Sequence, residues 1–255
     1  MPDHDRGRPA GPATPRWWHL YRKSGSVKVF HVDLTPDTAR EASAMDWLDT
    51  KEQVRWDHFR HARPQREFGL SRAALRAILC NRLGCDNEEL TFDTSEYGKP
   101  FALAGGIRAP VSFNISHSGS HGLIALAPEG RVGVDVEERV TRLGIDGTIE
   151  TMFTSNEHAE LASAEGEQKI HLFFRLWTMK EALVKAVGRG LHLDLSAFEI
   201  PVAVRGGVKR CSTFHFPQLP AVRWQLENLG SRGFAAAVAY ELDPGSAGQH
   251  RETLS

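Results

Sequence analysis

The sequence has few cysteines, and none is arranged as a disulfide or metal motif requires. Among 255 residues only Cys80, Cys85 and Cys211 are cysteines, and they form no C-x-x-C pair. Such a set argues against a disulfide framework or a cysteine-ligated zinc ion, and it is typical of free thiols in a reducing compartment. We therefore expect a cytoplasmic protein.

Long apolar runs and an excess of one charge are also absent. No stretch approaches the roughly 20 apolar residues that a membrane helix requires, and the first residues lack the apolar core of a secretory signal. The 31 basic and 32 acidic side chains leave a formal net charge of −1. Because nothing here favours binding to a membrane or to nucleic acid, we expect neither as a partner.

The composition that remains is ordinary for a globular protein, with 41% hydrophobic and 25% charged residues. Two strong helices are predicted over Arg66–Leu83 and Ile170–Gly188, where apolar residues recur at helical spacing and glycine marks the end. A further helical region is expected over Pro36–Arg63. Strands are predicted at Trp17–Leu34, Val111–Ser116, Gly122–Ala127, Val132–Glu137, Phe198–Val202, Val222–Leu226 and Phe234–Ala239. Helices mixed with short, hairpin-like strands predict an α+β fold rather than a doubly wound α/β sheet.

Both halves of the chain run from strand to helices to strands, although no residue-level repeat is visible. We place the N-terminal half at 16–128 and the C-terminal half at 129–243. Residues 1–15, rich in proline, glycine and charge, are expected to form a disordered tail, and 244–255 a second loose end.

Two carboxylates share one face of the predicted strand VGVDVE at 132–137. Alternate residues of a strand point the same way, so Asp135 and Glu137 lie together. They repel each other unless a cation lies between them, and their oxygens suit Mg²⁺, which usually binds a substrate phosphate as well. The alternative is a strand edge with a solvated acidic face, the common case for surface carboxylates.

The helix that contains WTMKEALVK at 177–185 places Glu181 and Lys185 four residues apart on one face. In one interpretation they form an ordinary surface pair. In the other, Glu181 is a third metal ligand and Lys185 meets phosphate oxygens.

Polar residues alternate with apolar ones along Phe113-Asn114-Ile115-Ser116-His117. A Ser116–His117 nucleophile pair is disfavoured, because neighbours on a strand point to opposite faces and the G-x-S-x-G elbow is missing. Hydrogen bonding to a phosphorylated ligand is the better functional role for Asn114 and Ser116. A polar strand end packed on the core is the alternative.

Fixed cations precede these motifs. The turn Gly98-Lys99-Pro100 holds one, but G-x-x-x-x-G-K-[ST] is absent, so it is not a P-loop. Most arginines of a basic stretch are expected to face solvent, while one or two could bind a phosphate, for which the guanidinium is well suited. These arginines are Arg55, Arg60, Arg63, Arg66, Arg72 and Arg76.

Read in order, GKP, FNISHSG, VGVDVE and WTMKEALVK resemble the 4′-phosphopantetheinyl transferase family, and within it the larger, surfactin-synthetase type. The match runs from about Arg55 to Leu191, more than half of the chain. The resemblance implies the fold of that family, with two similar halves that are each a small, mostly antiparallel sheet packed with helices. It also implies a monomer, whereas the short holo-acyl-carrier-protein synthase type assembles as a trimer.

The resemblance assigns roles to the motif residues. Asp135, Glu137 and Glu181 match an acidic triad that binds Mg²⁺, with Mn²⁺ as a possible substitute. Lys185 lies near the coenzyme A pyrophosphate in this comparison, and Lys180 is a basic neighbour at the same site.

The remaining matches concern the nucleotide of coenzyme A. Lys99 and Pro100 match a loop that lies along it. Ser116 and His117 match the segment at its 3′-phosphate, and Arg55 and Arg63 match basic residues there.

The reaction that the resemblance implies is Mg²⁺-dependent transfer of the 4′-phosphopantetheine arm of coenzyme A to a serine of apo acyl or peptidyl carrier proteins, with release of 3′,5′-ADP. Glu181, directly or through a bound water, is the candidate base, and Lys185 offsets charge on the phosphate. Two alternatives are a non-catalytic coenzyme A-binding regulatory module and a serine hydrolase using Ser116 and His117. The joint presence of three carboxylates favours the transferase.

Overall fold

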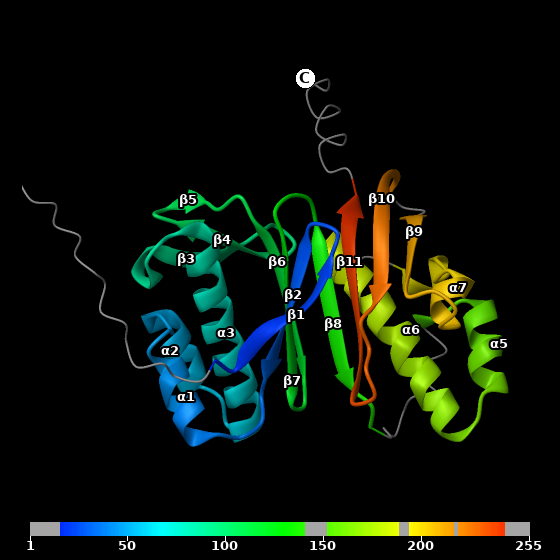
Figure 1. Cartoon of the computed structure of the whole chain (residues 1–255), viewed down its shortest axis with the longest axis horizontal. Helices are drawn as coiled ribbons and strands as arrows, with labels where there is room; N and C mark the ends of the chain where they lie inside the picture. Colours follow the sequence, from blue (N-terminus) through cyan, green and yellow to red (C-terminus); the bar gives the residue numbers. More distant parts are fainter. Residues whose placement is uncertain (1–15, 141–151, 189–193, 217–218, 243–255) are drawn as a thin grey trace, which may run out of the picture.

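The computed structural model of the chain describes residues 16–140, 152–188, 194–216 and 219–242, so the predicted tails, 1–15 and 244–255, lie outside it. Two four-stranded sheets lie in the middle of the molecule, and one long helix covers the outer face of each (Figure 1). All strand pairs in these sheets are antiparallel. The predicted α+β class, with small antiparallel sheets packed with helices, is confirmed.

The first sheet has the strand order β1-β2-β7-β6. Its strands are β1 (Trp18–Ser24), β2 (Val27–Asp33), β6 (Ser112–Ser118) and β7 (His121–Ala127). Helix α3 (Ala62–Leu83) packs on it through a buried apolar stripe that includes Leu70 and Leu75. The helix ends at Gly84, whose φ of 69° is left-handed and therefore favours glycine.

Two short helices, α1 (Thr38–Met45) and α2 (Thr50–Asp57), occupy the region predicted as one helical stretch. The break between them has a local cause, because the Asp49 side chain accepts the Glu52 backbone N–H and starts a new helix. Arg76 of α3 is fully buried, and its Nε donates to Glu52 at 2.6 Å, which attaches α2 to α3.

The second sheet has the order β8-β11-β10-β9. Its strands are β8 (Val132–Glu138), β9 (Cys211–Phe216), β10 (Leu219–Asn228) and β11 (Phe234–Leu242). Helix α6 (Gly166–Val187) covers its outer face and ends at Gly188, again left-handed with a φ of 74°. Helix α5 (Ser155–Ser163) precedes α6 and packs against it. The predicted boundary between residues 128 and 129 stays a prediction, and it falls between β7 and β8.

One predicted strand, Phe198–Val202, is wrong. The structure has a 3₁₀ turn at Leu195–Ala197 and a short helix α7 (Val202–Arg205) on either side of an irregular segment. Pro201 has no N–H to donate to a ladder, and the Ile200 N–H donates to the Glu157 side chain instead, at 2.8 Å.

A small third sheet was not predicted from the sequence, and neither was β9 (Cys211–Phe216). The small sheet consists of β3 (Leu90–Thr94), β4 (Pro100–Ala104) and β5 (Ile107–Arg108), and a 3₁₀ turn at Asn87–Glu89 leads into it. These strands are short, so they show too few alternating positions to be distinguished from loops by pattern.

The inner faces of the two main sheets pack against each other. Val29 and Leu123 of the first sheet and Val134 and Val238 of the second are fully buried in this shared core. Both faces of each sheet are therefore covered, which explains why β7 and β11 read as nearly continuous apolar runs. No helix of the described residues combines the length and the apolar character that crossing a membrane requires.

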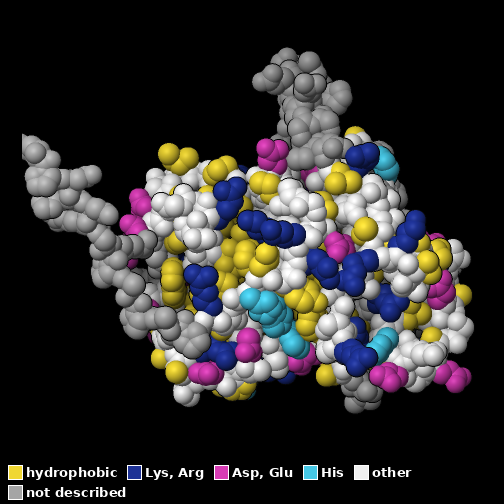
Figure 2. All heavy atoms as spheres, in the orientation of Figure 1, with side chains coloured by type: hydrophobic (Ala, Val, Ile, Leu, Met, Phe, Trp, Pro, Cys, Tyr) yellow, Lys and Arg dark blue, Asp and Glu magenta, His cyan; other side chains and the backbone are white. Residues whose placement is uncertain are grey.

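A histidine group lies where the two sheets meet near the surface. The His31 Nε2 and His121 Nδ1 atoms are 3.0 Å apart, and the His19 ring centroid lies 5.3 Å from that of His31. The His31 ring stacks on Phe234 of the second sheet, with centroids 5.8 Å apart. Figure 2 shows histidine side chains gathered near the middle of the face that it presents.

Candidate functional site

Strands β6 and β8 lie side by side, but the two are joined through side chains rather than through a backbone ladder. From Asn114 onward, every second residue of β6 accepts a backbone N–H of β8 through its side chain. The bonds run from Val134 N to Asn114 Oδ1 (2.9 Å), from Val136 N to Ser116 Oγ (3.3 Å) and from Glu138 N to Ser118 Oγ (3.2 Å). The polar alternation in β6 therefore serves the contact between the two sheets. This contact leaves Asn114 only 8% exposed and Ser116 only 7% exposed.

Asp135 lies at the centre of this contact and is only 3% exposed. Its Oδ1 accepts from Ser116 Oγ at 2.8 Å and from Lys185 Nζ at 2.6 Å, while its Oδ2 is buried without a hydrogen-bond partner. Burial raises the pKa of Asp135 to about 6, although the Lys185 ammonium opposes that shift. The site thus holds a carboxylate with one unsatisfied oxygen.

Glu137 lies close enough to both Asp135 and Glu181 to repel each of them. The Glu137 Oε2 accepts from Ser118 Oγ at 2.7 Å. Burial raises the pKa of Glu181, Glu137 raises it further, and Lys185 lowers it. Glu137 likewise adds to the raised pKa of Asp135. The structure therefore brings the three predicted carboxylates into one electrostatic neighbourhood together with Lys185.

A close crossing between β8 and α6 makes this grouping of carboxylates with Lys185 possible. A Cβ placed on Gly133 would lie 2.1 Å from the Ala182 carbonyl oxygen and 2.3 Å from the Ala186 nitrogen. Only glycine allows the strand to approach the helix backbone so closely. Two residues further along β8, Asp135 meets Lys185 of α6.

Asp135, Glu137 and Glu181 suit a metal ion by their chemistry but are not tightly grouped. In the part of the chain that the structure describes, no three His, Cys, Asp or Glu side chains are grouped tightly enough to hold one ion. The donor set nevertheless fits a hard divalent cation, since all three groups offer carboxylate oxygens. The buried, unpartnered Oδ2 of Asp135 would gain the partner that it lacks.

His117 lies beside the carboxylate group, on the exposed side of β6. Its Nδ1 is 3.5 Å from Glu67 Oε2, and Arg63 Nε donates to the other Glu67 oxygen at 2.8 Å. Burial lowers the pKa of His117, and the Glu67 carboxylate opposes this. The structure therefore brings together the predicted residues His117 and Arg63 through Glu67. Sequence reasoning missed Glu67, although its i,i+4 spacing from Arg63 was a signal.

Glu138 is a second acidic residue that sequence reasoning missed. Its Oε1 accepts the Ser120 backbone N–H at 2.7 Å, and its Oε2 lies 3.9 Å from Arg63 Nη2. A Cβ on Gly119 would overlap the Glu138 carboxylate at 1.7 Å, so the glycine of the β6–β7 turn makes room for it. Glu138 thus holds the turn that follows His117.

Lys99 lies at the end of α6. Its Nζ donates to the Val132 carbonyl at 3.0 Å and to the Ala186 carbonyl at 2.8 Å, and burial lowers its pKa to about 8. With Pro100 and Arg131 it lines a cavity of about 300 Å³. Lys99 therefore connects the small third sheet to the β8–α6 crossing.

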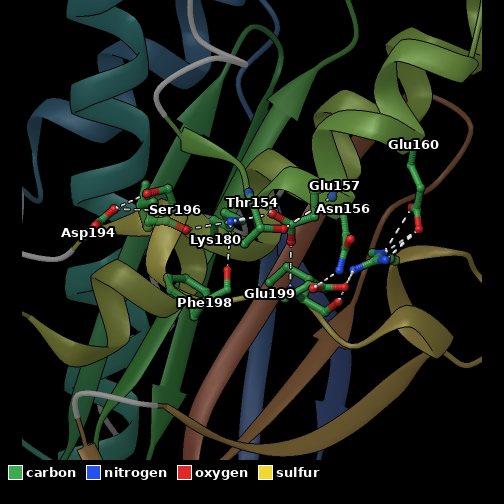
Figure 3. A network of polar contacts seen from close by, with 12 residues as sticks. Thr154, Asn156, Glu157, Glu160, Lys180, Asp194, Ser196, Phe198 and Glu199 are labelled. Atoms are coloured by element: carbon green, nitrogen blue, oxygen red, sulfur yellow. Dashed lines mark hydrogen bonds and ion pairs between the residues drawn. The ribbon is translucent and has the colours of Figure 1, made fainter.

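The other two candidate residues, Arg55 and Lys180, make their contacts away from the carboxylates. The Arg55 guanidinium lies 4.8 Å from the ring centroid of Phe68, in the first half of the molecule. Lys180 is only 1% exposed, and its Nζ contacts Glu157 at 2.7 Å (Figure 3). The same ammonium donates to the carbonyls of Leu195 (2.7 Å) and Phe198 (3.0 Å). Neighbouring residues of a helix are about 100° apart around its axis, so Lys180 and Glu181 point in different directions.

Comparison with known proteins gives one consistent result. Residues 131–239 match the 4′-phosphopantetheinyl transferase superfamily, and residues 34–129 match the 4′-phosphopantetheinyl transferase N-terminal family. The 4′-phosphopantetheinyl transferase HetI of Nostoc sp. is 30% identical over 177 residues, which cover 69% of this chain and 75% of HetI. The transferase Sfp of Bacillus subtilis is 26% identical over 221 residues, which cover 86% of this chain and 89% of Sfp. A relative from Synechocystis sp. is 35% identical over 149 residues, and the match covers 58% of this chain and 60% of that relative.

Proposed function

The chain belongs to the 4′-phosphopantetheinyl transferase superfamily and is an enzyme of this class, and from this premise we propose that it transfers the 4′-phosphopantetheine arm of coenzyme A to a serine of an apo acyl or peptidyl carrier protein. The observation that carries the proposal is the meeting of Asp135 and Glu137 with Glu181 and Lys185 at the Gly133 crossing. Acidic and basic groups combined in this way suit a bound pyrophosphate and its counter-ion. We expect a monomer.

Asp135, Glu137 and Glu181 would hold the divalent cation, Mg²⁺ or Mn²⁺. When bound, that ion supplies Lewis-acid neutralisation of pyrophosphate oxygens. Ser116 and Ser118 fix one oxygen each of Asp135 and Glu137, at 2.8 and 2.7 Å, so the remaining carboxylate oxygens are oriented before the ligand binds.

The groups proposed for coenzyme A lie around this centre. Lys185 would contact the pyrophosphate, and His117 with Arg63 would contact the 3′-phosphate, both oriented by Glu67. Lys99 and Pro100 would lie along the nucleotide at the cavity that they line. Asn114 and Ser116 support the site indirectly, because their polar atoms already bond to the backbone of β8, the strand that carries Asp135 and Glu137.

In the proposed reaction the carrier serine oxygen forms a bond to the β-phosphorus of coenzyme A, and the pyrophosphate P–O bond breaks. The departing 3′,5′-ADP takes the electron pair, and the serine proton passes to Glu181. Glu181 accepts this proton directly or through a bound water, since a carboxylate that also holds a cation is a weak base. Lys185 offsets negative charge on the phosphate.

The direct test is mass spectrometry of apo carrier proteins after incubation with coenzyme A and Mg²⁺. We expect a gain of one phosphopantetheine arm on serine. Carriers of fatty-acid, polyketide and nonribosomal-peptide systems that all stay unmodified would contradict the proposal.

The two rival functions make different predictions. A serine hydrolase needs an accessible nucleophile, whereas Ser116 is buried and its hydroxyl donates to Asp135. Labelling of Ser116 by a fluorophosphonate probe would support that rival. A non-catalytic coenzyme A-binding module should bind coenzyme A equally well with and without Mg²⁺, which calorimetric titration would reveal.

A further inference from the structure

The Lys185 ammonium lies directly on the acidic group. Its Nζ donates to Asp135 Oδ1 at 2.6 Å and to Ser116 Oγ at 3.1 Å. The Asp135 side chain is 4% exposed, whereas that of Lys185 is 28% exposed. A buried carboxylate and a partly exposed ammonium therefore form a close ion pair at the proposed ligand site.

Three other cations near the site, all within the described residues, are engaged elsewhere. Lys99 donates to the backbone carbonyls of Val132 and Ala186, and Lys180 pairs with Glu157. Arg63 pairs with Glu67. Among the described residues, Lys185 is thus the basic side chain that lies on Asp135, and its charge acts on Glu181 as well.

The two partners differ in their freedom to move. Asp135 is enclosed by β6 and α6 and is held by the Ser116 hydroxyl. Lys185 lies in the last turn of α6, and its four-carbon stem can change rotamer and carry the ammonium away without moving the backbone. When ligand binding separates the ion pair, Lys185 is therefore the partner that moves.

We infer that Lys185 is an internal counter-ion of the ligand-free site, and that its ammonium moves from Asp135 to a phosphate oxygen when coenzyme A and the divalent cation bind. This inference rests on the proposed function, because it assumes that both ligands share this site. A cation bound to Asp135 alone is repelled by the nearby ammonium, and a phosphate gives the ammonium another partner. The cation and coenzyme A therefore bind with positive coupling, which by linkage is equal in both directions.

The test measures metal binding rather than turnover. Mn²⁺ binding would be followed by electron paramagnetic resonance for the wild type and for Lys185→Met, each with and without coenzyme A. The wild type should bind Mn²⁺ on the order of ten-fold more tightly when coenzyme A is present. Without coenzyme A, Lys185→Met should bind Mn²⁺ more tightly than the wild type, and coenzyme A should strengthen Mn²⁺ binding less in this variant than in the wild type.

Two further variants control for charge and for folding. Lys185→Arg keeps a cation at this position, so it should bind Mn²⁺ as weakly as the wild type. Lys169→Met makes the same substitution near the other end of α6 and should leave the Mn²⁺ affinity unchanged. Thermal melting of every variant confirms that binding is compared between folded proteins, and Lys185→Gln replaces Lys185→Met if the latter does not fold.

Equal Mn²⁺ affinity in the wild type and in the neutral variants would overturn the inference, as would wild-type binding that coenzyme A does not strengthen. Carrier modification by the wild type, measured in parallel, separates this failure from that of the proposed function. A wild type that modifies carriers while Lys185→Met shows no gain in Mn²⁺ affinity retains the function and loses only the counter-ion role.

Discussion

Lys180 and Glu157 form a fully enclosed ion pair, with Nζ and Oε2 2.7 Å apart and the side chains 1% and 0% exposed. The pair connects the start of α5 to the middle of α6. Because the ammonium also holds the carbonyls of Leu195 and Phe198, it fixes the segment before α7 as well. The contacts of Lys180 are therefore those of a residue that supports the fold beside Glu181.

Removing one member of this pair should be costly. Lys180→Met leaves the Glu157 carboxylate buried without its cation, and we expect a loss of about 3–5 kcal/mol in the free energy of unfolding. The double variant Lys180→Met/Glu157→Leu removes both charges and should recover much of that loss. Urea unfolding measures both effects, and a single variant as stable as the wild type would show that the pair contributes little.

The Gly133 crossing should not tolerate a side chain. In Gly133→Ala the new Cβ meets the backbone of α6, so strand and helix must separate, and we expect a loss of about 1–3 kcal/mol or more in stability. Transfer to the carrier should fall as well, because Asp135 and Glu137 on β8 move away from Glu181 on α6. Gly233→Ala is a matched control, since the nearest heavy atom to its Cβ would be 3.9 Å away. Equal melting temperatures and activities for the two variants would contradict this account of the crossing.

The charge of Asp135 should matter for activity more than for folding. Asp135→Asn keeps the shape of the side chain and can still accept from Ser116, so we expect a folded protein with a melting temperature near that of the wild type. Carrier modification should fall about 100-fold or more, because one oxygen donor of the proposed cation site loses its charge. Glu181→Gln should behave in the same way. A steady-state assay checks this, and full activity in either variant would remove these carboxylates from the mechanism.

Chelation should abolish activity reversibly. EDTA should stop carrier modification, and an excess of Mg²⁺ or Mn²⁺ should restore it, because charge on the pyrophosphate is then neutralised again. Circular dichroism should show that EDTA leaves the fold unchanged. An enzyme that works at full rate in EDTA would rule out the proposed metal dependence.

The histidine group at the junction of the sheets should make stability depend on pH. Burial, with repulsion from His121 and His19, lowers the pKa of His31 from 6.5 to about 4, while Asp33 opposes the shift. The unfolded chain therefore takes up a proton near pH 6.5 that the folded protein takes up only near pH 4, so stability falls as the pH is lowered through this window. His121, whose pKa burial also lowers, adds to the same trend.

Urea unfolding at several pH values between 7.5 and about 4 measures this dependence. His31→Phe can keep the ring contact with Phe234 but has no proton to bind, so its free energy of unfolding should depend less steeply on pH. Parallel pH profiles for the wild type and His31→Phe would contradict this role of His31.

Periodicity was enough to predict the long helices and the shared direction of Asp135 and Glu137, because these depend on neighbours along the chain. It failed for the segment around Pro201, where side chains from α5 and α6 take up the backbone groups. It also missed Glu67, since nothing in the local pattern shows that His117 lies beside that position.

The sequence by itself determined the α+β class, the ends of the two long helices at Gly84 and Gly188, and the motifs that indicate a phosphopantetheinyl transferase. Helix and strand periods, like the left-handed conformation of a terminal glycine, are properties of a few consecutive residues. Only the tertiary structure decided that Ser116 and Ser118 would join two sheets, that Lys180 would be enclosed with Glu157, and that Lys185 would lie on Asp135. The partner of a polar group is set by whichever element packs against it, and that element can lie more than 100 residues away along the chain, as Glu241 does from Arg131.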